Sequence, residues 1–402
     1  RGFVLGSMSF GHGISHLYDL GFPLILRNIA EVLGYSDLRV AVLFSIRQAG
    51  SGVVNLVGGP LVDMLKDHWG LILTCCMIWS ALTFIIMGAS PNFTVLVIAV
   101  LLISIPGSLW HLPAAAALSQ RFPDRRGFAI TIHGTVANAC NYLGPLLAGA
   151  LLTVWLWRYV LFIYAAPAAV MAVFVWWSLK DVGREEGKGE VRRGLGVQLQ
   201  YSRTVLKNPV VLGLLSAAML RGIGLGAVSH WTPFYLTDED RGLDMGYIWA
   251  GVHLGLLAGM GVISGPILGP LSDRIGRKTV IVPGFVAAGA LSMAVVATGD
   301  SLLLLLVFAG MGLFTFALHH IIQAAVLDVV GRGTEATAIG LIFGLSGLVG
   351  IASPFLASQV IIKHLGGYGT IYYYAGILTL IPAVIVLFIP LRPKVPELTE
   401  AG

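Results

Sequence analysis

Three charged side chains fall inside long apolar stretches of the sequence: Asp19, Arg47 and Arg221. An ionisable group inside a bilayer is costly and usually has a functional role. The guanidinium of Arg221, which is flanked by glycines, can bind a carboxylate or a phosphonate through paired hydrogen bonds. Arg47 lies closer to one end of its stretch, so it either binds the same anion or extends to the membrane surface. Asp19 can exchange protons, or it can form an ion pair with Arg221.

Histidines accumulate around Asp19. The spacing of His12, His16 and Asp19 places all three on one face of a helix. Imidazole titrates near neutral pH, so this face can exchange protons or bind a polar ligand. The same spacing also permits a metal site. Because the sequence contains no dedicated ligand set beyond these residues, we predict no bound metal and no other cofactor.

The elements that carry these residues must be membrane helices. The chain has 402 residues, of which 56% are hydrophobic and 11% are charged, whereas soluble proteins carry about 25% charged residues. Segments of about 20 apolar residues cross a bilayer as helices. We therefore predict an all-α integral membrane protein. The predicted spans are residues 4–31, 39–62, 70–89, 93–119, 127–153, 158–179, 209–236, 245–272, 278–298, 302–328, 335–362 and 367–391.

A short charged segment, Gly269-Pro-Leu-Ser-Asp-Arg-Ile-Gly-Arg-Lys278, joins two of these spans, and a partial copy, Gly59-Pro-Leu-Val-Asp63, stands at the same place in the first half. Both resemble the signature G-x-L-x-D-R-x-G-R-K of the major facilitator superfamily. The resemblance implies twelve transmembrane helices in two pseudo-symmetric six-helix bundles, with substrate bound between them. It assigns the loop to gating. The predicted gating residues are Asp63, Gly59, Gly269, Asp273, Arg274 and Arg277.

The same resemblance places the first, fourth, seventh and tenth spans around a central cavity. His111, which follows Trp110 in the fourth span, then occupies a position equivalent to that of His320 in the tenth. The predicted proton-coupling residues are Asp19, His16 and His111. The predicted substrate-binding residues are Arg221, Arg47, His12, His320, Trp110 and His230.

A polar linker at 180–208 divides the chain into two six-helix bundles, residues 1–179 and 209–402. If the termini are cytoplasmic, 18 of the 25 Lys and Arg residues lie on the inner side, 5 lie on the outer side and 2 lie within spans. Basic residues collect on the cytoplasmic side of membrane proteins. We therefore predict a multi-pass protein of the inner (plasma) membrane with cytoplasmic termini. The net charge of +5 is confined to one side and does not indicate nucleic-acid binding.

Short segments of the first half are similar to the fosmidomycin-resistance type of exporter. They are Ser15-His16, Trp110-His111-x-Pro113 and Asn138-x5-Gly144-Pro-Leu-Leu-Ala148. The last segment also resembles the fifth-span motif of drug/proton antiporters. The chain departs from the exporter type where Asp19 stands in place of Asn. It also lacks the basic residue that many drug/proton antiporters carry in the fourth span, where only His111 is present.

These resemblances imply a secondary active transporter that works by alternating access, and not an enzyme. The fifth-span motif favours proton-coupled export of small amphiphilic or anionic organic compounds. Arg221 and Arg47 favour the alternative, a proton-coupled importer or exchanger of organic anions such as carboxylates. The expected partners are the small-molecule substrate, protons and the lipid bilayer. The protein is expected to be a monomer.

The charge asymmetry predicts the orientation of the linker. In a variant without Cys75, Cys76 and Cys140, a cysteine in place of Glu190 should react with a membrane-impermeant maleimide only after the membrane is permeabilised. A cysteine in place of Asp240, in a predicted outer loop, is the control and should react in intact cells. Reaction at position 190 in intact cells would contradict the predicted orientation.

Overall fold

The computed structural model describes residues 2–122, 126–184, 206–329 and 335–391, and within these ranges every regular element is a helix. The first half contains α1 (Gly2–Leu33), α2 (Asp37–Met64), η1 (Lys66–His68), α3 (Trp69–Gly88), α4 (Phe93–Arg121), α5 (Arg126–Val154) and α6 (Trp157–Leu179). The second half contains α8 (Pro209–Thr237), α9 (Tyr247–Gly259), α10 (Gly261–Ile275), α11 (Arg277–Thr298), α12 (Leu302–Val329), α13 (Glu335–Gly350), α14 (Ser353–Phe355), η3 (Leu356–Ile362), α15 (Lys363–Leu365) and α16 (Thr370–Phe388).

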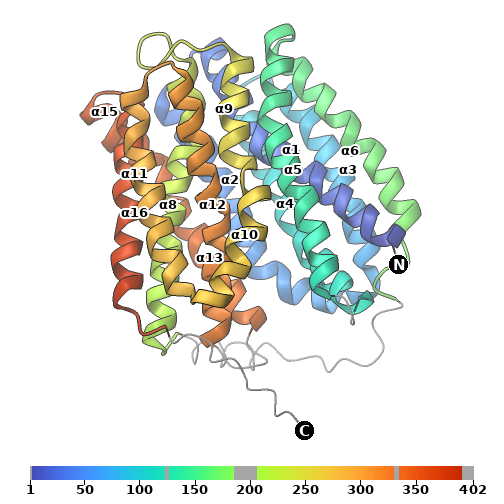
Figure 1. Ribbon diagram of the computed structural model, residues 1–402. Helices are drawn as coiled ribbons and strands as arrows, with labels where there is room; N and C mark the ends of the chain where they lie inside the picture. Colours follow the sequence, from blue (N-terminus) through green and yellow to red (C-terminus); the bar gives the residue numbers. More distant parts are fainter. Residues whose placement is uncertain (1, 123–125, 185–205, 330–334, 392–402) are drawn as a thin grey trace.

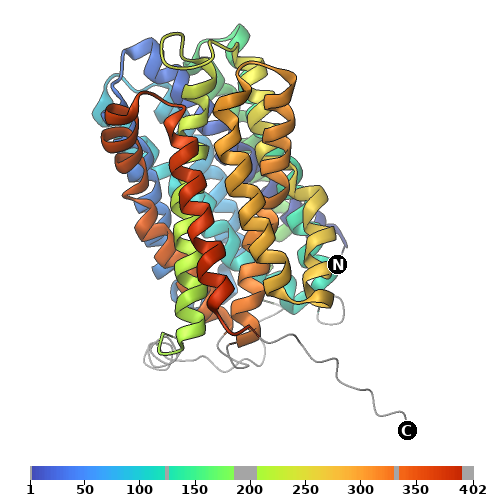
Figure 2. The ribbon, with the colours of Figure 1, turned by 60° about the vertical axis from the view of Figure 1, so that its left-hand side comes forward.

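The long helices run side by side in an elongated bundle (Figures 1 and 2). The upper end in Figure 1 carries the turns between α5 and α6 and between α8 and α9, and the lower end carries the turn between α10 and α11. In the described residues, nine helical segments are long and apolar enough to cross a membrane. α1, α2 and α5 fall outside this set, because they carry polar side chains such as Asp19, Arg47 and Asn141.

Large apolar side chains cover the outside of the bundle. Phe388 is 79% exposed, Leu302 is 75% exposed and Val154 is 74% exposed. In water such a surface would be unfavourable, whereas in a bilayer it meets lipid, and the helices satisfy their own backbone hydrogen bonds. The chain is therefore a multi-pass membrane protein.

Two of the predicted spans are not regular α-helix throughout. The span predicted at 245–272 breaks at Met260, which is flanked by glycines, into α9 and α10. The span predicted at 335–362 leaves regular α-helix after Gly350. Ser353 then begins a short helix, with Pro354 in its first turn, that continues as the π-helix η3. Proline lacks an N–H and cannot continue the preceding pattern of hydrogen bonds.

Glycines bring α5 into backbone contact with helices of both halves. A Cβ on Gly144 would lie 2.4 Å from the carbonyl oxygen of Leu17 in α1, and one on Gly21 would lie 2.9 Å from that of Gly144. On the side facing α9, a Cβ on Gly251 would lie 2.5 Å from the carbonyl oxygen of Pro145. Small residues permit this close approach of helices in lipid. Helix α5 thereby joins the two halves.

Among the described residues, the two halves share a hydrophobic core toward the upper end. One cluster of buried side chains contains residues of both halves, among them Phe44 of α2 and Trp231 of α8, whose ring centroids lie 6.3 Å apart. Toward the lower end, the described residues form two separate clusters. One contains Met8 and Leu118 of the first half, and the other contains Leu214 of the second half. Within the part of the chain that the structure describes, the buried apolar clusters are therefore shared by the halves above and divided between them below.

The contact between α1 and α5 predicts how the chain responds to added volume. Gly144→Ala places a methyl group against backbone that cannot rotate away, and such overpacking costs about 1–3 kcal/mol. The thermal unfolding temperature of the purified protein should fall by several degrees. Gly134→Ala in the same helix is the matched control, because nothing lies within 4 Å of its Cβ position. Equal unfolding temperatures for the two variants would contradict the close packing.

Candidate functional site

Asp19 and Arg47 form an ion pair between α1 and α2. Arg47 Nη2 lies 2.5 Å from Asp19 Oδ1, and the side chains are 17% and 36% exposed, respectively. The guanidinium of Arg47 also lies over the ring of Phe22, with Cζ 4.9 Å from the ring centroid. The expected pair between Asp19 and Arg221 is wrong for this conformation, because the guanidinium of Arg221 is directed toward α12 instead. The carboxylate of Asp19 remains partly open to solvent while it is paired.

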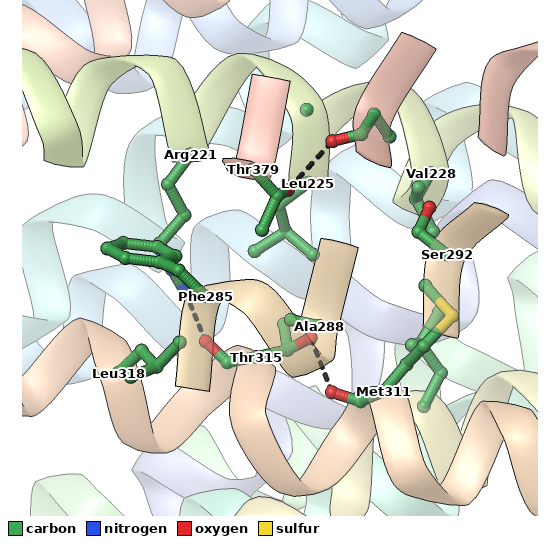
Figure 3. Close-up of a pocket in the computed structure, with 13 residues that line it drawn as sticks. Arg221, Leu225, Val228, Phe285, Ala288, Ser292, Met311, Thr315, Leu318 and Thr379 are labelled. Carbon is green, nitrogen blue, oxygen red and sulfur yellow. Dashed lines mark hydrogen bonds between the residues drawn. The ribbon is translucent and has the colours of Figure 1, made fainter. Parts of the chain in front are cut away.

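Arg221 is a buried cation that donates a hydrogen bond to a backbone carbonyl group. Its side chain is 8% exposed, and Nη2 donates a hydrogen bond to the carbonyl oxygen of Thr315 (Figure 3). The ion pairs among the described residues do not include Arg221. It lines a cavity of about 30 Å³ whose other walls include Leu225, Phe285 and Met311 (Figure 3). A buried charge needs a counter-charge or polar partners, so this position can accept an anionic group.

The histidines of the tenth predicted span lie near this arginine. His319 Nε2 is 3.0 Å from Nε2 of Gln323, which donates the hydrogen bond if this imidazole nitrogen is unprotonated. The ring of His320 lies 5.4 Å from that of His319, and its side chain is exposed. The structure thus leaves His320 accessible to a ligand.

Helices α1, α4 and α5 bring four histidines together. His12 Nε2 lies 3.1 Å from His111 Nδ1, and the rings of His12 and His16 lie 4.5 Å apart. His133 stacks on His12 with a centroid separation of 4.1 Å. His16 Nδ1 lies 2.8 Å from Asn141 Oδ1. Sequence spacing places His12 and His16 on one face, but it does not reveal His133 and Asn141 as their neighbours.

Trp110 and His230, which are predicted to bind substrate, occupy packing interfaces in this conformation. Trp110 is 0% exposed, and its ring lies where a Cβ on Gly11 would come within 2.3 Å. His230 is 7% exposed and stacks on Phe44 of α2 with a centroid separation of 4.1 Å. Both rings fill space between helices, so in this conformation they present almost no surface to a bound molecule.

Charged side chains link the two halves at the upper end. Arg241, between α8 and α9, places Nη1 2.7 Å from Oδ2 of Asp37 at the start of α2. The hydroxyl of Tyr368 donates to Asp37 Oδ1 at 2.7 Å and accepts from Arg241. Burial raises the pKa of that hydroxyl, and the Asp37 carboxylate raises it further, so it stays a donor. Arg27 of α1 lies 3.5 Å from Asp238, which adds a second ionic link.

The complete signature loop, at the lower end, makes its ion pairs within the second half. Arg277 Nη2 lies 2.5 Å from Asp273 Oδ1, and Arg277 Nε lies 3.0 Å from Asp328 Oδ2. Asp273 is 57% exposed and Arg274 is exposed. Nothing lies within 4 Å of the Cβ position of Gly269. The ion pairs described for the loop therefore do not hold it to the first half in this conformation.

The partial copy of the loop is described by its backbone. Gly59 and Asp63 lie in the last turns of α2, and their surroundings fall outside the described part of the structure. Their gating role stays a prediction.

A helical membrane bundle with paired charges inside it, whose two halves share a core at one end, is typical of membrane transporters. The sequence profile of the Major Facilitator Superfamily matches residues 7–315 and 260–402. The chain belongs to this superfamily. The predicted fold, twelve transmembrane helices in two pseudo-symmetric six-helix bundles, is confirmed.

Known proteins with low sequence identity to this chain are transport and resistance proteins. The fosmidomycin resistance protein of Escherichia coli strain K12 is 22% identical over 288 residues, which cover 69% of this chain and 67% of that protein. Multidrug resistance protein MdtG of Proteus mirabilis is 25% identical over 277 residues, which cover 66% of this chain and 67% of the relative. The protein named "Probable nitrate/nitrite antiporter NarK1" of Thermus thermophilus is 24% identical over 280 residues, covering 65% of this chain and 58% of the relative.

Two solved structures share the fold. A bacterial homolog of the human lysosomal transporter Spinster, in an inward-facing and unoccupied conformation, matches with a TM-score of 0.74 and 14% identity, covering 96% of this chain and 95% of that one. The nucleoside transporter NupG matches with a TM-score of 0.76 and 16% identity, covering 96% of this chain and 99% of that one.

The upper ionic contact predicts a change in the balance between conformations. Arg241→Ala removes an ion pair worth up to about 1 kcal/mol, so the population with separated upper ends should rise about fivefold. Spin labels at Val32 and Leu365, exposed positions near the upper ends of the two halves, would report this as a larger fraction of long distances. Arg39→Ala is the control, because the ring contacts of Arg39 lie within the first half. The same distance distribution in both variants would refute the role of the Arg241–Asp37 ion pair in holding the upper ends together.

Proposed function

We propose that this protein is a proton-coupled secondary transporter that exports small amphiphilic or anionic organic compounds by alternating access. The observation that carries the proposal is the buried guanidinium of Arg221, which lies beside a cavity and donates to the Thr315 carbonyl. Replacing that bond by a bond to a carboxylate or phosphonate would supply the missing counter-charge. The glycines at positions 222 and 224 have no side chains, so they leave space for a ligand next to Arg221.

The ion pair between Asp19 and Arg47 supplies the proton-linked step in this proposal. Protonation of Asp19 removes the charge that holds Arg47, so the two side chains would separate when a proton binds. His16 lies on the same face of α1 as Asp19, one helical turn before it, and His111 of α4 contacts that face. These histidines would relay protons or tune the affinity of Asp19 for them. Arg47, once released, becomes a second site for an anion.

The packing of the two halves supports alternating access. We propose that residues 1–179 and 209–402 rock as two bodies, joined by the linker at 180–208. The shared upper core and the link between Arg241 and Asp37 close one end. In the opposite conformation the signature loop, through Asp273, Arg274 and Arg277, would close the lower end instead.

The basic residues support an orientation with the lower end in the cytoplasm. Arg274, Arg277 and Lys278 stand at that end, and Lys and Arg favour the cytoplasmic side. We propose that the protein resides in the inner (plasma) membrane with both termini in the cytoplasm.

A second candidate function is proton-coupled import or exchange of organic anions such as carboxylates. Arg221 and Arg47 favour it, because two guanidinium groups suit an anion with two charged ends. The relative named as a nitrate/nitrite antiporter adds support for an anionic substrate. Direction of transport separates the two candidates, since both use the same arginines.

Transport in proteoliposomes tests both the proposal and its direction. With fosmidomycin and succinate as radiolabelled probes, an antiporter should accumulate its substrate in vesicles with an acidic interior, and a symporter in vesicles with an acidic exterior. Arg221→Lys keeps the charge but loses the planar fork. It should weaken probe binding by about tenfold or more, since hydrogen bonds to a charged group contribute about 1.5–3 kcal/mol. Asp19→Asn should abolish accumulation driven by the pH difference and retain exchange.

Arg184→Ala is the matched control for removal of a guanidinium. Its side chain is exposed and pairs with Asp181 near the lower end, so binding and accumulation should stay at the level of the parent. Accumulation by Asp19→Asn under the same pH difference would rule out its role in coupling. Unchanged probe affinity in Arg221→Lys would rule out guanidinium recognition by that residue.

A further inference from the structure

A cluster of three imidazoles lies on the first-half side of the protein. His12 and His16 of α1 and His111 of α4 each offer a ring nitrogen, and these nitrogens lie within 4.8 Å of one another. Two of them, His12 Nε2 and His111 Nδ1, are 3.1 Å apart. A tetrahedral metal with Zn–N bonds of about 2.0–2.1 Å holds its nitrogens roughly 3.3 Å apart. A small inward movement of His16 would therefore close a three-nitrogen site.

We propose that His12, His16 and His111 bind a divalent transition-metal cation of the Zn²⁺ or Co²⁺ type. Neutral imidazole suits these cations, whereas Ca²⁺ and Mg²⁺ prefer oxygen ligands. The inference goes beyond the proposed function: it gives His16 and His111 a cation in place of a proton relay, leaves the proposed roles of Asp19 and Arg221 unchanged, and does not depend on the identity of the organic substrate. It also differs from the expectation drawn from sequence spacing, which considered His12 and His16 with Asp19 and did not include His111.

The surrounding residues orient two of the rings as metal ligands require. His16 Nδ1 lies 2.8 Å from Asn141 Oδ1, and an amide oxygen only accepts, so the proton is on Nδ1 of His16. His12 Nδ1 faces the carbonyl oxygen of His133 at 3.4 Å, which favours a proton on that nitrogen as well. The Nε2 atoms of both rings then carry lone pairs. Metal-binding histidines are typically held in this way by a hydrogen bond to the other nitrogen.

The inward nitrogen of His16 is otherwise unsatisfied. Its Nε2 is buried and has no hydrogen-bond partner among the described residues. Within the cluster, His111 can donate one proton to His12 Nε2, which leaves His16 Nε2 without a donor. A single cation would satisfy the lone pairs of all three rings, provided that His111 Nδ1 is deprotonated. Hydrogen bonds among the rings cannot achieve this.

The site would keep an open coordination position. His111 is exposed while His12 is buried, so one side of the cluster is accessible and the other is closed by protein. His133 covers the closed side by stacking on His12. Three protein ligands and one open position are typical of zinc sites that bind a further small ligand. Asp19 lies one helical turn from His16, and its carboxylate would favour a cation nearby.

Binding of Co²⁺ to the purified full-length protein tests the proposal. The protein should carry an affinity tag without histidines and be treated with EDTA first. Added Co²⁺ should give the intense visible absorption of tetrahedral coordination at about one equivalent, and Zn²⁺ should displace it. His16→Ala and His111→Ala should each weaken Co²⁺ binding by about a hundredfold. His364→Ala is the control, because that residue lies in the short exposed helix α15 at the opposite half.

Asn141 provides a test of positioning. Asn141→Ala removes the acceptor for His16 Nδ1, and loss of such an outer partner lowers metal affinity by about 10–100-fold. Asn141→Asp keeps an acceptor and should retain the affinity of the parent. A merely structural role for Asn141 would lower the unfolding temperature without this difference in affinity.

A relay of hydrogen-bonded imidazoles is the competing explanation, and the same titration separates it. Absence of the tetrahedral spectrum in the parent, or equal Co²⁺ affinity in the parent and in His16→Ala, would overturn the metal site. If His111→Ala does not purify as a monodisperse protein, His111→Asn serves in its place. Loss of Co²⁺ binding in His16→Asn at an unchanged unfolding temperature would support the site independently of folding.

Discussion

The cost of placing charge inside a bilayer governs the interior of this protein. A single Arg or Asp at the centre of a membrane helix costs about 2.5–3.5 kcal/mol on insertion scales. The structure meets this cost in two ways. Asp19 and Arg47 neutralise each other across α1 and α2. Arg221 instead depends on a backbone carbonyl beside a cavity. Because these groups must avoid lipid, α1, α2 and α8 all have to present one face to the interior.

Helices that carry such polar faces need another source of cohesion, and the close approach of backbones provides it. α1 and α5 are among the least apolar of the long helices, yet they are in direct contact at Gly21 and Gly144. Dispersion forces at this short separation replace the hydrophobic effect, which does not drive helix association within lipid. α5 meets α9 through Gly251 in the same way, so the polar helices are also those that connect the halves.

Periodicity and composition predicted most of the fold, because the spans of a membrane protein are set by apolar length. The repeat of the signature loop further predicted that the chain folds as two similar halves. The breaks at Met260 and Pro354 were not predicted, since proline and glycine are common within membrane helices and only packing decides where one breaks. The ends of the remaining helices agree with the sequence to within a few residues.

The candidate site was predicted less completely, for a geometric reason. The sequence identified Asp19, Arg47 and Arg221, because charges in apolar segments are conspicuous. It suggested Arg221 as the partner of Asp19, whereas the structure pairs Asp19 with Arg47. The partner depends on the rotation of α2 and α8 about their axes, and a rotation of one residue position changes which side chain faces inward. Asn141 could have been identified as a partner from the polar residues of the fifth-span motif. The partner of Arg221 is the backbone carbonyl of Thr315, and because every residue has such a carbonyl, the sequence cannot show which one is used.

Helix α1 connects the interior chemistry to the closed end. His12, His16, Asp19 and Arg27 follow one another along a single continuous helix, and Arg27 reaches Asp238 of the second half. The helix is held against α5 by close backbone contact at Gly21, so a shift of α1 at that depth must also move or bend its neighbouring turns. A change of charge at Asp19, or of ligation at the histidines, therefore acts on the element that also holds the upper link. Residues separated by several helical turns are in this way parts of one mechanical unit, and the position of α1 relative to α5 and α8 is what such a change must alter.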